Sequence, residues 1–79
     1  MGRVTVKFKM FDVRPIIAQG TEPLPEIRAA IEALAPGEGL TISSPFLPAP
    51  LIEKLAGEGF RSRVERLSGG WLTHFWRDE

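Results

Sequence analysis

The spacing of apolar residues switches along this chain between the period of a strand and the period of a helix. Over residues 3–10 every second residue is apolar, which is typical of a strand with one buried face. These residues are Val4, Val6, Phe8 and Met10. Over residues 24–34 apolar residues recur every three or four positions, which predicts a helix with one apolar stripe. The residues of the stripe are Leu24, Ile27, Ile31 and Leu34.

The same criteria predict strands at residues 40–43, 60–67 and 71–77, and a second helix at residues 51–56. Residues 16–22 and 44–50 are expected to be loops, and Ser68-Gly69-Gly70 predicts a hairpin turn. The predicted order is therefore β-α-β-α-β-β, within one domain spanning residues 1–79. Strands joined by a helical crossover run parallel, whereas hairpin strands run antiparallel. We predict an α/β (α+β) two-layer sandwich, with a mixed four-stranded sheet and two helices on one face.

The segment GTEPLPEI at residues 20–27 predicts where the first helix begins. The first backbone N–H groups of a helix have no partner within it, so a proline there gives up no hydrogen bond. Pro23 and Pro25 both suit this first turn, and the helix is expected to start at one or the other. Glu22 and Glu26 then lie near the positive end of the helix dipole, where each contributes about 0.3–1 kcal/mol. This arrangement explains both carboxylates as helix-starting residues.

Ten basic and ten acidic residues cancel, so the chain has no overall charge to attract nucleic acid or an anionic membrane. No apolar run approaches the roughly 20 residues of a membrane span, and no signal peptide is visible. We therefore expect a cytoplasmic protein. The absence of cysteine excludes disulfides and thiolate metal sites. Asparagine is also absent and arginine outnumbers lysine, which favours a heat-adapted source.

Three short motifs resemble the TusA/SirA-like family of small sulfur-carrier domains. The family has an Asp-x-Arg at the end of its first strand, a Cys-Pro-x-Pro at the front of its first helix, and a Pro-Gly-Glu turn into its second strand. The corresponding segments here are Asp12-Val13-Arg14, Glu22-Pro23-Leu24-Pro25 and Leu34-Ala35-Pro36-Gly37-Glu38-Gly39-Leu40. The predicted order of elements is also similar, so the resemblance implies a TusA-like fold for nearly the whole chain.

The chain departs from that family at Glu22. The family's cysteine carries sulfur as a persulfide, which a carboxylate cannot form. Sulfur transfer by the family mechanism is therefore excluded. The chain looks more like an uncharacterised branch that lacks the cysteine and carries an Asp-His-Asp-Pro-type segment after its second strand. Here residues 44–51 keep a proline and a leucine of that segment, but not its histidine or aspartates.

The candidate binding residues lie around the start of the first helix. Asp12 and Arg14 are two positions apart and share one side of an extended segment. They form either a local ion pair that braces the turn, or a binding rim together with Glu22. Pro23 and Pro25 would belong to the same rim.

No catalytic or metal site is predicted. His74 is the only histidine, and neither a nucleophile nor further metal ligands are visible beside it. Arg61, Arg63 and Glu65 share one strand face, which we interpret as a solvated face, with anion or nucleic-acid binding as the alternative. We therefore expect no cofactor and no enzymatic activity.

The last predicted strand is apolar on both faces, because Trp71, Thr73 and Phe75 alternate with Leu72, His74 and Trp76. Two helices can cover only one face of the sheet, so the other face is expected to be wrapped by a loop or to bind a partner. If Trp71 and Phe75 face the helices, then Leu72, His74 and Trp76 form the interface. The expected partner is another protein or a second copy in a two-fold homodimer.

These features favour a small non-enzymatic binding or regulatory module that acts through protein–protein contacts. Two alternatives remain open. The resemblance implies an accessory domain that docks on sulfur-transfer or respiratory enzymes, and the helix start suggests a small-ligand binder at the first helix N-terminus. Neither nucleic acid nor a membrane is expected as a partner.

Overall fold

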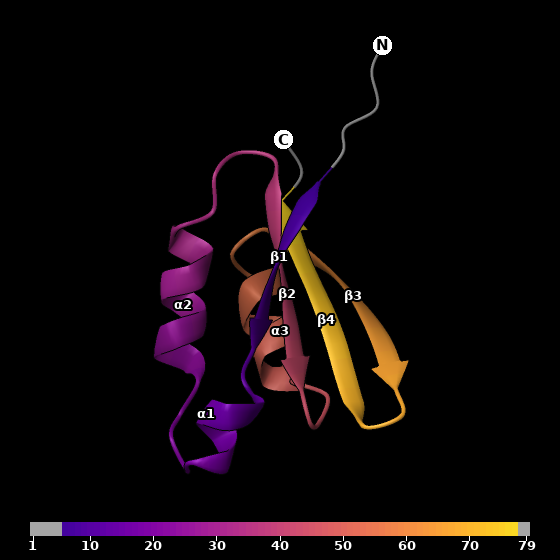
Figure 1. Ribbon diagram of the computed structural model, residues 1–79. Coiled ribbons are helices and arrows are strands. Elements are labelled where there is room, and N and C mark those ends of the chain that lie inside the picture. Colours follow the sequence, from indigo (N-terminus) through magenta and orange to yellow (C-terminus); the bar gives the residue numbers. More distant parts are fainter. Residues whose placement is uncertain (1–5, 78–79) are drawn as a thin grey trace.

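The computed structural model describes residues 6–77. Its elements are β1 (Lys7–Asp12), α1 (Arg14–Ala18), α2 (Leu24–Glu32), β2 (Glu38–Ser44), α3 (Ala49–Ala56), β3 (Phe60–Leu67) and β4 (Gly70–Arg77). One four-stranded sheet forms the first layer, and α2 and α3 form the second (Figure 1). The predicted two-layer α/β sandwich is therefore confirmed.

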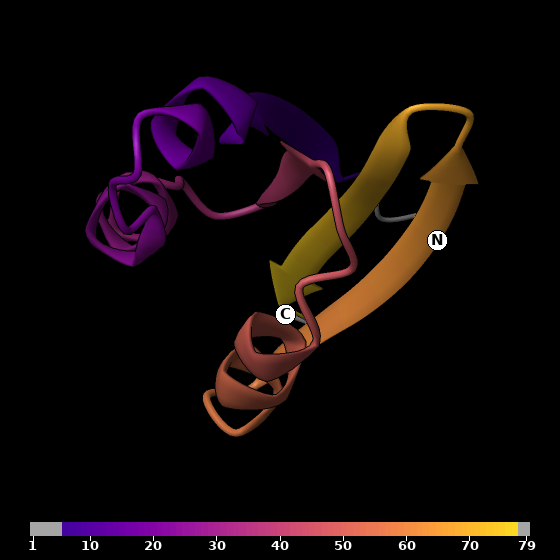
Figure 2. The same cartoon turned by 90° about the horizontal axis from the view of Figure 1, so that it is seen from below.

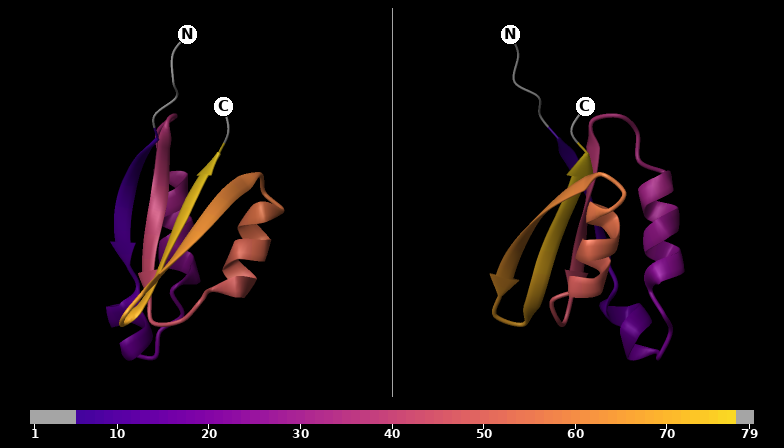
Figure 3. Two further views of the ribbon diagram at one scale, coloured as in Figure 1. Left: turned by 90° about the vertical axis from the view of Figure 1, so that its right-hand side faces the viewer. Right: turned by 180° about the vertical axis from the view of Figure 1, so that it is seen from behind.

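The strands lie in the order β1-β2-β4-β3, as Figure 3 shows from the side. β1 and β2 are parallel, whereas β4 is antiparallel to both β2 and β3. The sheet is therefore mixed, as predicted, with β2 and β4 in its centre and β1 and β3 at its edges. Ser68 and Gly69 turn the β3–β4 hairpin. Gly70 follows them, and a Cβ there would lie only 2.6 Å from the carbonyl oxygen of Ser44.

α2 begins at Leu24, with Pro23 as its N-cap and Pro25 in its first turn. Both prolines therefore stand at the helix start, as the sequence predicts, and Glu26 is the acidic residue of the first turn. The helix ends before Gly37, whose φ of 85° lets the chain turn into β2.

The structure adds a short helix, α1, within a region where the sequence predicts the end of a strand and a loop. α1 spans Arg14–Ala18, with Pro15 in its first turn. The side chain of Asp12 accepts a hydrogen bond of 3.0 Å from the backbone N–H of Arg14 and so marks its start. A helix of five residues is too short to show a repeating apolar stripe, which is why periodicity did not reveal it.

The core lies between the sheet and the two longer helices, which cover the same face (Figure 2). Ile27 and Ile31 of α2 are buried, as predicted, and Leu55 of α3 is buried with them. They form one cluster with five further buried apolar residues. These residues are Val13, Leu40, Ile42, Phe60 and Phe75. No helix in residues 6–77 is long and apolar enough to cross a membrane.

The predicted buried face of the first strand is wrong. Phe8 is 43% exposed and Met10 is 64% exposed. Phe11 packs against the core and Val13 is buried, so these two residues set the phase of the strand. Lys7 and Lys9 lie on the same face of β1 as Phe11. Because β1 is at the edge of the sheet, both lysines are exposed. Val4 lies outside the described residues.

The phase of β4 settles which face of the sheet is open. Thr73 and Phe75 are fully buried and point toward the helices. Leu72, His74 and Trp76 alternate with them and lie on the opposite side, partly exposed. This is the phase in which Leu72, His74 and Trp76 face away from the helices. We call this helix-free side of the sheet the open face; it also carries Phe8 and Met10.

Candidate functional site

An apolar pocket lies between α1, α2 and α3, at the carboxyl end of β2. Its volume is about 290 Å³. Its floor consists of residues that are almost fully buried, namely Val13, Ile27, Ile42 and Ser44. We call this cavity the helix pocket.

The walls of the helix pocket come from three separate segments of the chain. Ile17 projects from α1, Leu24 from α2 and Leu51 from α3. The proline-broken segment before α3 adds Phe46, which is 52% exposed. Ser44 is a polar residue of the floor, and its Oγ donates a hydrogen bond of 2.7 Å to the carbonyl oxygen of Phe46. The pocket interior therefore offers mainly apolar contacts.

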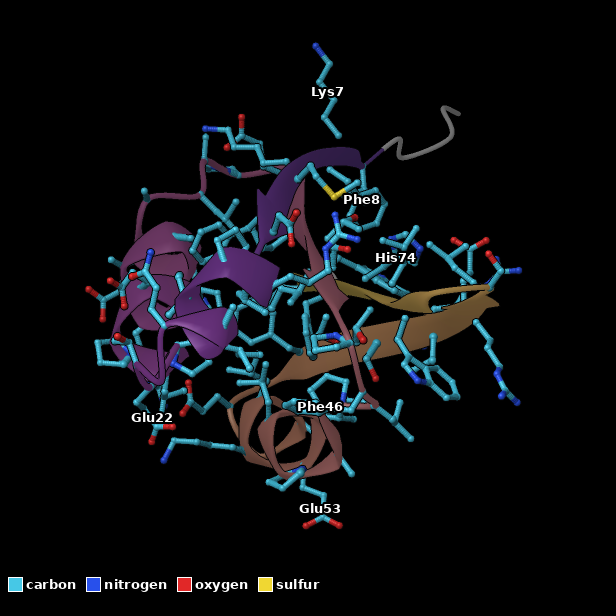
Figure 4. All side chains as sticks on the ribbon, turned by 60° about the horizontal axis from the view of Figure 1, so that its bottom comes forward. Lys7, Phe8, Glu22, Phe46, Glu53 and His74 are labelled. Atoms are coloured by element: carbon cyan, nitrogen blue, oxygen red, sulfur yellow. The ribbon has the colours of Figure 1, made fainter. Side chains whose placement is uncertain are left out.

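Glu22 and Lys54 supply opposite charges among the residues that line the helix pocket. Glu22 precedes α2, and Lys54 lies in the last turn of α3. Figure 4 labels Glu22 and Phe46, which come from the segments that lead into α2 and α3. A ligand of the pocket can therefore meet a carboxylate or an ammonium group as well as the apolar interior.

The structure brings together two of the five predicted binding residues. Glu22 and Pro23 line the helix pocket. Pro25 is exposed in the first turn of α2, outside the pocket lining. Asp12 and Arg14 instead form a bidentate pair, in which Nε of Arg14 lies 2.9 Å from Oδ1 and Nη2 lies 2.7 Å from Oδ2 of Asp12.

The environment of Asp12 fits the interpretation as a local ion pair. The guanidinium of Arg14 and, after it, the Arg14 backbone N–H lower the pKa of Asp12 to about 2. The carboxylate is therefore charged at neutral pH and accepts hydrogen bonds from three nitrogens of the same residue. Its observed contacts brace the junction between β1 and α1.

A second cavity, of about 470 Å³, lies on the open face. Its lining includes Phe8 from β1, Arg63 and Glu65 from β3, and His74 and Trp76 from β4. Val6 and Thr41 complete the lining. We call this cavity the open-face pocket. Leu72, the third predicted interface residue, lies on the same face but outside this lining.

His74 has hydrogen-bond partners at both ring nitrogens, which the sequence did not reveal. Nε2 lies 2.6 Å from Oε1 of Glu65, and Nδ1 lies 2.8 Å from Oγ1 of Thr41. A carboxylate only accepts hydrogen bonds, so Nε2 carries a proton and donates it to Glu65. The chain of hydroxyl, imidazole and carboxylate has the groups of a nucleophile–base pair. However, Thr41 is only 4% exposed, so this arrangement supports an orienting role for the contacts to His74.

Among residues 6–77, no group of three or more histidine, aspartate or glutamate side chains could hold a metal ion.

The comparison with protein families gives one match, which spans residues 10–77. The matched family is described as an uncharacterized conserved protein, DUF2249. The chain belongs to this family. No curated protein and no solved structure matches the chain. The DUF2249 match covers every residue that lines the helix pocket, whereas Phe8 of the open-face pocket precedes the matched segment.

Proposed function

We propose that this DUF2249 domain is a non-enzymatic binding module that takes a compact, mainly apolar molecule in the helix pocket. The observation that carries the proposal is a solvent-accessible cavity whose floor is the hydrophobic core itself. Protein interiors are normally packed with few voids larger than a water molecule. An apolar cavity of about 290 Å³ is close to the lower end of the range that small-molecule sites occupy.

The position of the pocket supports the predicted ligand site at the start of the first long helix. Glu22 and Pro23 line the pocket, and the TusA-like resemblance aligns Glu22 with the carrier's cysteine. The proposed ligand site therefore lies at the position of the functional residue of the TusA-like carriers. Its chemistry must differ from theirs, because the chain has no thiol to carry sulfur. A cytoplasmic location remains part of this proposal.

A second candidate is that an apolar side chain of a protein partner enters the same pocket. Phe46 and Leu47 favour this role, because they are 52% and 41% exposed in the segment that leads into α3. Exposed apolar residues beside a pocket are common at protein interfaces. This candidate corresponds to the predicted protein–protein function, including docking on sulfur-transfer or respiratory enzymes.

A titration with indole, followed through the methyl NMR signals of the protein, tests the proposal. Indole is compact and neutral, so its binding reports the apolar interior rather than Glu22 or Lys54. We expect saturable shifts at Ile27, Ile42 and Leu51, which line the pocket, and smaller shifts at Ile31, which does not.

Two matched variants show whether the pocket itself is occupied. Leu51→Phe adds volume at a lining residue and should weaken indole binding. Ile52→Phe makes a similar change at the next position, which packs against the core but does not line the pocket, and should leave binding intact. Equal binding to both folded variants would contradict the proposal. No response to indole would favour the protein-partner candidate instead.

A further inference from the structure

We propose that the open-face pocket is a second binding site, for a small planar aromatic molecule that carries a carboxylate or a phosphate. The proposal is independent of the helix pocket, which lies among the helices on the other side of the sheet. It rests on three features of the open face, namely an aromatic corner, an imidazole held in place, and an arginine without a partner among the described residues.

The aromatic corner is formed by Phe8 and Trp76. Their ring centroids are 6.1 Å apart and their planes meet at 89°. Gly39 makes this position of Phe8 possible, because a Cβ on Gly39 would lie 2.6 Å from the Phe8 ring. A planar ligand that stacks on one of the two rings presents its face or edge to the other, which is a favourable arrangement for aromatic groups.

His74 forms a fixed part of the same site. Its ring lies 5.4 Å from that of Phe8, and Figure 4 shows the two side chains next to each other. Thr41 and Glu65 hold the imidazole at both nitrogens. The ring therefore has little freedom to lose when a ligand binds, and such preorganisation favours affinity.

The charge of the ligand follows from Arg63. This exposed residue lines the pocket and has no hydrogen-bond or ion-pair partner among residues 6–77. The acidic residue of the pocket, Glu65, is instead hydrogen-bonded to His74. An arginine presents a planar fork of donors that suits a carboxylate or a phosphate. The available cation next to aromatic rings therefore selects a planar anion.

Titrations with 2-naphthoate and with adenosine 5′-monophosphate, followed by amide NMR, test this inference. The two probes share an aromatic plane and an anionic group, and their relative affinities distinguish an aromatic acid from a nucleotide. We expect saturable shifts of the Trp76 indole N–H signal by at least one probe, with a dissociation constant on the order of 1 mM or tighter. The variant Trp71→Phe assigns that signal, because the chain has two tryptophans.

Three variants separate the charge from the aromatic contacts. Arg63→Gln should weaken binding of the anionic probe by roughly two- to fivefold, as for loss of an exposed ion pair. Arg66→Gln is the matched control, since Arg66 lies on the opposite side of β3 against Trp71. Glu65→Gln keeps an acceptor for His74 and removes a negative charge, so it should strengthen binding. Neutral 2-naphthalenemethanol should bind more weakly than 2-naphthoate and should not distinguish Arg63→Gln from the unmodified protein.

Several results would overturn the inference. One is the absence of any Trp76 shift with either probe up to about 10 mM. Another is an equal loss of affinity in the Arg63 and Arg66 variants. A third is a Trp76 signal that changes with protein concentration alone, because a second copy of the chain would then cover the open face.

Discussion

Asp12 both pairs with Arg14 and starts helix α1. Its Oδ1 accepts hydrogen bonds from the backbone N–H and from Nε of Arg14, while Oδ2 accepts from Nη2. The same two residues therefore end the first strand and turn the chain toward the helix pocket, whose lining includes Val13 between them. At the scale of single residues, this motif is a structural unit.

The first prediction concerns the acid stability that this pair provides. The pKa of Asp12 is lowered to about 2 in the folded protein, mainly by Arg14, and is about 3.9 in an unfolded chain. Because the folded-state pKa is the lower one, the stabilisation is fully present above about pH 4 and is lost as the pH falls through about 2. A carbon-13 NMR titration of the Asp12 carboxyl group measures this pKa directly. Arg14→Gln should raise it toward the ordinary value, and Arg66→Gln should leave it unchanged.

Helix α2 illustrates the scale of a single element, because its two sides have different roles. Ile27 and Ile31 bury the side that faces the sheet, and Ile27 also reaches the floor of the helix pocket. Ile31 lies one turn further along and does not line that pocket. Packing against the sheet and lining of the helix pocket can therefore be changed separately.

The second prediction uses this separation. Ile31 is 8% exposed, so Ile31→Ala should lower the free energy of unfolding by about 2–5 kcal/mol, through lost burial and the cavity left behind. Glu32→Ala, at an exposed position of the same helix, should change it by less than about 0.5 kcal/mol. Chemical denaturation measures both values. A loss below about 1 kcal/mol for Ile31→Ala would show that the apolar stripe does not pack as described.

At the scale of the whole molecule, α2 is tied to the segment that follows α3. Arg28 donates two hydrogen bonds to Glu58, one of them with Nη1 2.7 Å from Oε1 and the other from Nη2 to Oε2. The helix pocket is lined by residues 22–27 around the start of α2 and by residues 48–54 of the α3 region. Arg28 follows the first of these segments in the sequence, and Glu58 follows the second. The pair thus connects the two helices whose spacing determines the width of the pocket.

The third prediction is that Arg28 and Glu58 act as one unit. Arg28 donates two hydrogen bonds to the Glu58 carboxylate, and this hydrogen bonding lowers the pKa of Glu58. Arg28→Gln and Glu58→Gln should each lower the melting temperature, and the double variant should lower it by less than the sum of the two. Strictly additive effects in this double-mutant cycle would contradict a direct interaction. Added salt should reduce the difference between the variants and the original protein.

The sequence by itself determined which segments form most elements and in what order. Periodicity depends on neighbours a few positions away, so it revealed the stripe of α2 and the two apolar faces of β4. Pro23 and Pro25 likewise indicated the helix start, because their effect on the backbone is local. Local rules did not reveal α1, since a helix of five residues contains no apolar repeat.

Only the tertiary structure decided which face each strand buries and what its side chains meet. The strict alternation of β1 predicted burial of Phe8, yet Phe11 packs on the core and Phe8 lies on the open face beside Gly39. Thr41 and His74, which share a hydrogen bond, are 33 positions apart in the chain. The helix pocket likewise combines residues from three helices and β2. Such contacts depend on how elements pair and pack across the fold, and the local spacing of residues carries no record of that pairing.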